Sequence, residues 1–381
     1  MSISNIYLDY NATTPVDDRV LEAMLPYFST QFGNASSKTH SFGWTAKDAV
    51  EKSRQEVADL LNCIPQEIIF TAGATESINI AIKSVAEIYV NKGKHIVTAA
   101  TEHKAVLDTC EYLEKKGYSI TVLPVNREGN IDLKELESSI TPQTILVCIM
   151  FANNETGVIH PIEEIANIVH EKGSIFMCDA TQAVGKIKVD VQQYNIDLLA
   201  MSAHKMYGPK GVGALFIRRK NPRVTIAAQT HGGGHENGLR SGTLNVPGIV
   251  GLGMACKIAE EEMWENSIKL SRLRTTLEQG FVELGNIFVN GDIRNRLANV
   301  SNLCFTGLKA DRLISKTPSI AVATGSACSS AIASPSHVLK AMGLSDEMAY
   351  ASVRFSLGKN NTQEEIIATL NSYKKVLSIG E

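Results

Sequence analysis

The sequence predicts an α/β protein whose mostly parallel sheet is covered by helices. Between residues 44 and 218, short apolar segments alternate with segments of helical periodicity, and this alternation is typical of parallel sheets with helices on both faces. The chain has 381 residues, which is too many for one ordinary hydrophobic core, so we expect two domains. A long helical segment over residues 256–284 would link the sheet to a smaller C-terminal domain.

The individual elements follow from their residue patterns. Apolar side chains on one helical face predict an amphipathic helix over residues 44–62. Further helices are expected to begin near Thr75 and His103. Apolar runs of strand length predict strands at residues 67–71, 95–99, 119–123, 144–151, 174–179, 197–202 and 213–218.

Composition and charge limit the classes of function. A hydrophobic content of 44% with 20% charged residues is ordinary for a globular protein, and the net charge of −3 gives no reason to expect a nucleic acid or an anionic membrane as a partner. The longest apolar run, residues 145–152, is far too short to span a bilayer, and the N-terminus shows no signal-peptide pattern. The seven cysteines form no CxxC pair and no metal-ligand spacing, so we expect no metal site and a reducing, cytoplasmic location.

Two polar residues stand at the ends of strand-like runs. Lys205 closely follows an apolar run, where an ammonium is costly to bury but an imine-forming lysine is well placed. Asp179 ends another apolar run, and a carboxylate near such a lysine is what a pyridinium nitrogen requires. Taken singly, each would be read as a surface lysine or an unrelated acid. The pair makes pyridoxal 5′-phosphate (PLP) the leading cofactor.

Several motifs then resemble one enzyme family. The segments Asp179–Gln182 and Ser202–Lys205 are similar to the cofactor site of class V aminotransferase-like, fold-type I PLP enzymes. The segments Arg240–Thr243 and Thr324–Ser330 narrow the resemblance to NifS/IscS-type cysteine desulfurases of the long-loop group, and the similarity runs from Tyr7 to about Gly358.

The resemblance implies a domain layout. Residues 16–256 would form the large PLP-binding domain, and residues 257–381 a small α+β domain that carries the catalytic cysteine loop. The first 15 residues would pack near the small domain.

The resemblance also implies a set of cofactor contacts. Backbone N–H groups of Ala74 and Thr75, at a strand-to-helix turn, suit a phosphate, although helix capping alone explains this sequence. His103 would stack on the cofactor ring and move protons, with helix capping again the alternative. Gln182 and Asn154 would lie at the phenolic oxygen. Further phosphate contacts would come from Ser202, His204 and Thr243, and Thr243 would reach the phosphate of the neighbouring subunit in a homodimer.

The remaining predicted residues concern the substrate. Arg354 matches the α-carboxylate of L-cysteine, with a structural salt bridge as the alternative, and Asn154 and Asn34 would assist. Cys328, in a small and polar loop rather than an apolar one, would be the nucleophile that accepts sulfur.

The predicted reaction converts L-cysteine to L-alanine and leaves the sulfur on Cys328 as a persulfide. The sulfur would then pass to an acceptor protein, either an iron–sulfur scaffold or a sulfur-relay protein. The alternatives are another class V PLP enzyme, such as a selenocysteine lyase or an aminotransferase, and a non-catalytic scaffold that keeps the fold.

Overall fold

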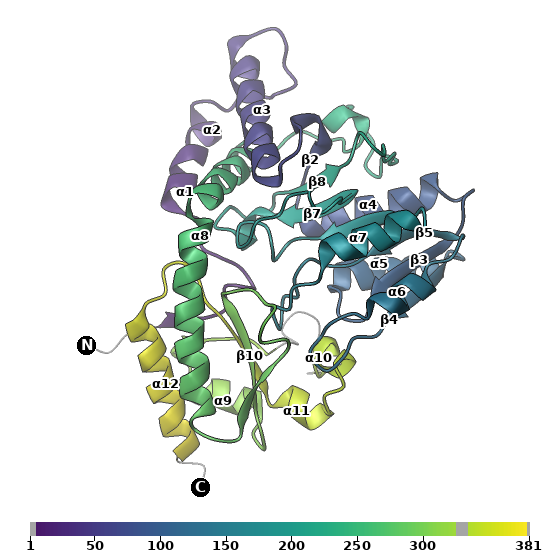
Figure 1. The fold of residues 1–381 in the computed structure, drawn as a ribbon. Helices are drawn as coiled ribbons and strands as arrows, with labels where there is room; N and C mark the ends of the chain where they lie inside the picture. Colours follow the sequence, from purple (N-terminus) through teal and green to yellow (C-terminus); the bar gives the residue numbers. More distant parts are fainter. Residues whose placement is uncertain (1–4, 325–333, 379–381) are drawn as a thin grey trace.

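A seven-stranded sheet forms the centre of the larger part of the molecule (Figure 1). The computed structural model describes residues 5–324 and 334–378. The strand order is β2 (Ile68–Thr71), β8 (Gly213–Ile217), β7 (Leu198–Ser202), β6 (Ile175–Asp179), β5 (Thr144–Cys148), β3 (His95–Ala99) and β4 (Ser119–Leu123). Pairing is parallel from β7 to β4, whereas β8 runs antiparallel to both of its neighbours. The mostly parallel sheet predicted from the sequence is therefore confirmed.

Alternating side chains of each central strand face two different helical layers. Val97 and Val147 belong to one core cluster, which also contains residues of α3 (Ser41–Leu61), α6 (Leu133–Ser139), α7 (Ile162–Glu171) and the start of α8. Ile96 and Leu146 belong to a second cluster, which contains residues of α4 (Ala74–Ile88) and α5 (Lys104–Glu114). Because both faces are buried, the strands read as continuous apolar runs.

Helix α8 (Val246–Val282) begins ten residues before the predicted start. Its start signal is Asn245, whose side chain accepts a hydrogen bond from the N–H of Gly248 at 3.1 Å. The glycines in this stretch argue against a helix from sequence alone, but a Cβ on Gly253 would come within 2.7 Å of Ser53 in α3. Close approach of α3 and α8 therefore explains a glycine inside a helix.

Two other predicted limits need correction. Helix α3 begins at Ser41 rather than at residue 44, because the Nδ1 atom of His40 accepts a hydrogen bond from Gly43 and caps the helix. Strand β5 ends at Cys148 rather than at Phe151. The backbone N–H groups of Ile149 and Phe151 nevertheless still donate to β6, and both side chains are buried, which gives the longer apolar run.

A smaller α+β layer follows α8. Its antiparallel sheet has the order β12 (Ser352–Ser356), β10 (Val300–Phe305) and β9 (Ile287–Asn290). The aromatic rings of Phe281, Phe305, Phe355 and Tyr373 pack together in its core. The helices of this part are α9 (Ala310–Lys316), α10 (His337–Ala341), α11 (Asp346–Tyr350) and α12 (Gln363–Ser378). Two short helices, α1 (Asp18–Met24) and α2 (Pro26–Ser29), precede α3 in the chain.

The N-terminal segment joins the two parts. Strand β1 (Ile6–Tyr7) pairs with β11 (Ile320–Ala321) in the smaller part, and Thr14 then donates its N–H to the carbonyl of His204 at 3.0 Å. The proposed domain limits at residues 15/16 and 256/257 stay a prediction, and the second of them lies inside α8.

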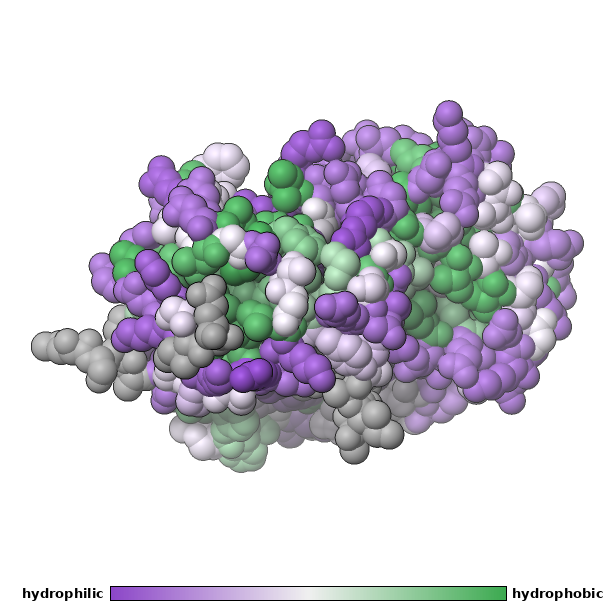
Figure 2. Space-filling view, turned by 90° about the horizontal axis from the view of Figure 1, so that it is seen from below, coloured by the Kyte–Doolittle hydropathy of each residue, from purple (hydrophilic) through white to green (hydrophobic). Residues whose placement is uncertain are grey.

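The end of the molecule that carries α12 has a mostly hydrophilic surface, on which hydrophobic side chains gather in separate areas (Figure 2). No helix in the described part of the chain is long and apolar enough to cross a membrane.

Candidate active site

The lysine and the aspartate of the sequence argument lie at the carboxyl ends of neighbouring parallel strands. Asp179 ends β6, and Lys205 lies three residues beyond β7 in the 3-10 turn η2 (Ala203–Lys205). The Oδ1 atom of Asp179 accepts hydrogen bonds from the backbone N–H of Thr181 at 3.0 Å and from its hydroxyl. Among the described residues none is bonded to Oδ2, so one oxygen of this 6% exposed carboxylate is available to a ring nitrogen.

The start of α4 offers donors to an anion. Gly73, with a φ of 149°, precedes the helix without a side-chain cap, and no described residue accepts from the backbone N–H of Ala74 or Thr75. A Cβ on Gly73 would lie 3.6 Å from the Oγ atom of Ser202, so that hydroxyl faces the same turn. Unsatisfied N–H groups and the helix dipole favour negative charge, so these residues fit a phosphate group.

The ring of His204 is bonded to the N-terminal segment. Its Nδ1 atom bonds the hydroxyl of Thr13 at 3.1 Å, which turns that edge of the ring toward the N-terminal segment. Burial, with the charges of Lys205 and Lys210, lowers the pKa of His204 to about 4. His204 is therefore neutral at pH 7, and its role at the phosphate stays a prediction.

His103 caps a helix, as the alternative interpretation held. Its Nδ1 atom accepts a hydrogen bond from the N–H of Ala105 at 3.1 Å at the start of α5, which places the proton of a neutral ring on Nε2. The capping bond fixes the ring while leaving Nε2 available for proton transfer. Its stacking on a cofactor stays a prediction.

The residue before His103 is an unforeseen buried acid. Glu102 accepts a hydrogen bond from the N–H of Met150 at 2.7 Å through Oε1, while Oε2 is buried without a partner among the described residues. Burial first, and the neighbouring charge of Asp179 as well, raise the pKa of Glu102 well above its ordinary value. Burial beside Asp179 thus favours the protonated, neutral form of Glu102.

Arg354 combines an internal ion pair with an unused donor. Its Nη2 atom lies 2.6 Å from Asp9, and its Nη1 atom donates to the carbonyl of Asn154 at 3.1 Å. The salt bridge of the alternative interpretation is therefore present. The Nε atom, however, is buried with no partner among the described residues. A buried donor without a hydrogen-bond partner costs free energy. A carboxylate arriving there would satisfy it.

Two residues to which the sequence argument gave no role link the predicted ones. The backbone carbonyl of Asn11 accepts from Lys205 at 2.6 Å and from the side chain of Gln182 at 3.0 Å, and its side chain donates to the carbonyl of Asn154 at 3.1 Å. Lys186 donates to the side-chain oxygens of Asn11 at 2.9 Å and of Gln182 at 2.5 Å. The available signals were that Asn11 lies within the segment of family similarity, which begins at Tyr7, and that Lys186 follows Gln182 by four residues.

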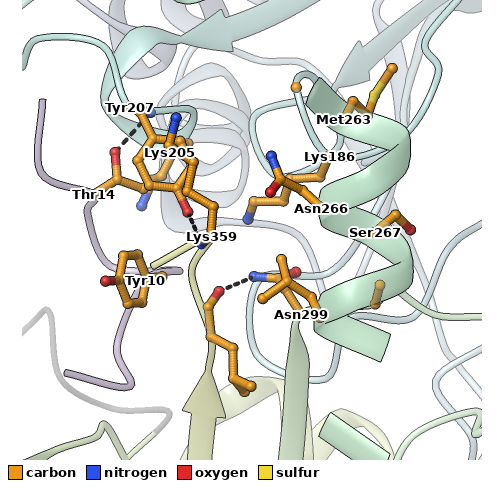
Figure 3. A pocket seen from close by; sticks show the side chains of 14 residues that line it. Tyr10, Thr14, Lys186, Lys205, Tyr207, Met263, Asn266, Ser267, Asn299 and Lys359 are labelled. Carbon is orange, nitrogen blue, oxygen red and sulfur yellow. Dashed lines mark hydrogen bonds between the residues drawn. The ribbon is translucent and has the colours of Figure 1, made fainter. Parts of the chain in front are cut away.

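A pocket lies beside this network, between the N-terminal segment and α8 (Figure 3). Lys186 and Lys205 line it, together with Tyr207 and Lys359. The backbone N–H of Lys359 donates to the hydroxyl of Tyr207, and its ammonium pairs with Asp17 and Glu262.

Two predicted residues, Asn34 and Thr243, lie at the surface, apart from the hydrogen bonds of Asn11 and Lys186. Asn34 is exposed, and its side-chain oxygen accepts from the N–H of Ser36 at 2.9 Å, because the loop before α3 projects away from the sheet. Thr243 is exposed as well. Cys328 lies outside the described residues. Next to that segment, Ala323 exchanges backbone hydrogen bonds with Arg354, and Ser336 donates to the buried carboxyl of Glu155 at 2.5 Å.

The described cysteines are unpaired, and burial raises the pKa of Cys63, Cys110, Cys148, Cys178, Cys256 and Cys304. A raised pKa makes a thiol less reactive. In the same described part, no group of three His, Cys, Asp or Glu side chains is placed to hold a metal ion.

The chain is similar to known proteins over nearly its whole length. The family model for aminotransferase class-V matches residues 6–368. A relative from Anaeromyxobacter dehalogenans named cysteine desulfurase IscS is 52% identical over 362 residues, which cover 95% of this chain and 89% of the relative. A solved NifS-like protein is 40% identical with a TM-score of 0.92, covering 98% of this chain and all of the other. A structure of SspA in complex with cysteine is 37% identical with a TM-score of 0.82, covering 93% and 99%.

Proposed function

The chain belongs to the aminotransferase class-V family, and on that premise we propose that it is a PLP-dependent cysteine desulfurase. The observation that carries the proposal is the convergence of Lys205, Asp179 and the unsatisfied start of α4 at one edge of the sheet. Relatives with this activity in their name match nearly the whole chain. The substrate is L-cysteine, and the products are L-alanine and a protein-bound sulfur.

When bound, PLP supplies an electron sink that weakens bonds at the amino-acid substrate's Cα. The chain's own residues hold and orient the reactants. The N–H groups of Ala74 and Thr75 with the Ser202 hydroxyl bind the phosphate, and Asp179 keeps the ring nitrogen protonated. Gln182 donates to the phenolic oxygen, and Asn154 lies nearby.

Proton movement is divided between two side chains. The amine of Lys205 takes and returns the proton at Cα, because it lies where the substrate amine must arrive. Nε2 of His103 moves protons between the substrate thiol and the accepting cysteine. Arg354 orients the substrate through its carboxylate.

The sulfur step needs no outside oxidant or reductant. The thiolate of Cys328 attacks the substrate sulfur, the S–S bond forms, and the C–S bond breaks with its electron pair going to the carbon. The substrate's Cβ then takes up a proton and becomes the methyl group of alanine. Cys328 is left as a persulfide, ready for transfer to an acceptor protein.

The partners belong to the same proposal. An iron–sulfur scaffold or a sulfur-relay protein is the acceptor, and the enzyme is a cytoplasmic homodimer in which Thr243 contacts the neighbouring subunit's phosphate. The surface position of Thr243 and the ion pair that ties Arg240 to Glu76 at the start of α4 support this arrangement.

The direct test is to incubate the PLP-loaded protein with L-cysteine and measure alanine and protein-bound sulfur. We expect one alanine for each sulfur released by a thiol reductant. Transamination products without sulfur transfer would instead identify an aminotransferase, and no turnover with a bound cofactor would identify a scaffold.

The Asp179→Asn variant should bind the cofactor, but its turnover rate should fall by about 10²-fold or more, because the neutral amide no longer stabilises a protonated ring nitrogen. Turnover and cofactor content measured together test this. Near-normal turnover would move the role to another residue.

The Arg354→Lys variant should need a higher L-cysteine concentration for half-saturation while its cofactor content stays normal, because lysine keeps the charge but loses the planar donor fork. Asp9→Asn is the matched control, since it removes the internal ion pair and leaves the guanidinium. Equal effects of the two variants on saturation would show that Arg354 is structural.

A further inference from the structure

A lysine in an unusual environment lies directly behind the proposed site. Burial first, and then the charges of Lys205 and Arg354, lower the pKa of Lys186 well below its ordinary value. Its two described hydrogen-bond acceptors are side-chain amide oxygens, those of Asn11 and Gln182. No ion pair within 4.0 Å joins Lys186 to an acidic side chain in the described part of the chain. Burying an amino group costs free energy, and the hydrogen bonds that Lys186 donates explain why it lies here.

Those bonds decide which way two amides face. The oxygen and nitrogen of an amide have nearly the same shape, so only their partners fix the orientation. An ammonium or amine hydrogen pointing at Oε1 of Gln182 forces Nε2 to the opposite side, where it donates to the Asn11 carbonyl that Lys205 also contacts. The side-chain oxygen of Asn11 likewise accepts hydrogen bonds from Lys186 and Asn299. These bonds direct the side-chain nitrogen of Asn11 to the carbonyl of Asn154.

We propose that Lys186 is a positioning residue that fixes the amides of Gln182 and Asn11, so that Gln182 presents its N–H group toward Lys205 and the phenolic oxygen of the cofactor. The proposal rests on the proposed function for the identity of the cofactor. Lys186 itself touches neither substrate nor cofactor in this assignment. It acts through Gln182 and Asn11.

The test uses the absorbance of the cofactor-loaded protein as a function of pH, which reports proton binding at the cofactor without turnover. A hydrogen-bond donor at the phenolic oxygen lowers the proton affinity of the cofactor, because it withdraws electron density from the atoms that would otherwise bind the proton. The Lys186→Met variant should therefore raise the midpoint pH of the absorbance change, corresponding to about tenfold tighter proton binding. Loss of a neighbouring positive charge acts in the same direction.

The charged groups around Lys186 are retained in this design. Lys205 comes from η2 and Arg354 from β12, and Lys359, which lines the same pocket, is already paired with Asp17 and Glu262. Lys186 borders that pocket, and Lys186→Arg, which keeps the donors, should restore the midpoint. Lys188→Met is the matched control, since its side chain is 73% exposed and should leave the midpoint unchanged.

The possible outcomes separate the two proposals. If the unaltered protein forms no bond between Lys205 and PLP, the proposed function is wrong. If that bond forms but Lys186→Met leaves the midpoint unchanged or lowers it, only the role of Lys186 is wrong, even where the melting temperature falls. Should Lys186→Met fail to fold, Lys186→Gln replaces it. That variant keeps one donating group and should shift the midpoint upward by a smaller amount, and an unchanged midpoint would contradict the proposal.

Discussion

The Lys205→Ala variant should lose all measurable desulfuration and should no longer carry a cofactor that borohydride fixes to the protein. The expectation follows from the position of Lys205 at the end of β7, beside the carboxylate that ends β6. Its amine is both the attachment point of the cofactor and the base at Cα, so one substitution removes two functions. The loss should exceed that of any other single substitution in the binding network.

Mass spectrometry after borohydride treatment measures the attachment directly. In the unaltered protein the cofactor mass should be found on the peptide that contains Lys205. Lys210→Ala is a useful control, because this exposed lysine lies five residues away in the same loop. A variant without Lys205 that still fixes the cofactor to another lysine, and still produces alanine from cysteine, would refute the assignment.

The Cys328→Ser variant should keep its cofactor and bind L-cysteine but release no sulfide and form no persulfide. A serine hydroxyl is a far weaker nucleophile toward sulfur than a thiolate, so the C–S bond has no partner to which the sulfur can pass. The absorbance change on adding cysteine should remain, which separates this defect from loss of substrate binding.

The location of the transferred sulfur provides the decisive measurement. After addition of L-cysteine, the peptide that contains Cys328 should gain the mass of one sulfur atom. Cys110→Ser serves as the control, because that thiol is buried and burial raises its pKa to about 12. Sulfur found on Cys63, Cys110, Cys256 or Cys304, together with full activity of the Cys328 variant, would contradict the mechanism.

Local sequence patterns predicted the strands of the sheet well apart from the end of β5, because both faces of the central strands are buried and their apolar runs are unmistakable. Asp179 and Lys205 were found for the same reason, since each is a charged residue at the boundary of such a run. The early start of α8 was missed because its glycines look unfavourable until α3 is seen packing against them.

The contacts around the site could not be predicted in this way, because they depend on where distant segments cross. From sequence alone Lys186 looks like an ordinary surface lysine, because nothing local shows that residues 10–14 pack against it. Asn34, predicted to assist at the substrate carboxylate, accepts a hydrogen bond from the N–H of Ser36 within its own turn at the surface, and its contact with the substrate stays a prediction. The ion pair of Arg354 with Asp9 was weighed in general terms, but its partner could not be named from sequence.

The crossing of the N-terminal segment has a consequence for the order in which the protein is built. Ile6 pairs with Ile320, and the backbone of Asn11 donates to the hydroxyl of Ser356, 345 residues later in the chain. During synthesis this segment emerges from the ribosome long before these partners do, and contacts so distant in sequence form slowly. The carbonyl groups that hold Lys205 belong to this same segment. The surroundings of Lys205 are therefore completed only after the strands that contain Ile320 and Ser356 have been synthesised, and a nascent chain should capture cofactor only after that point.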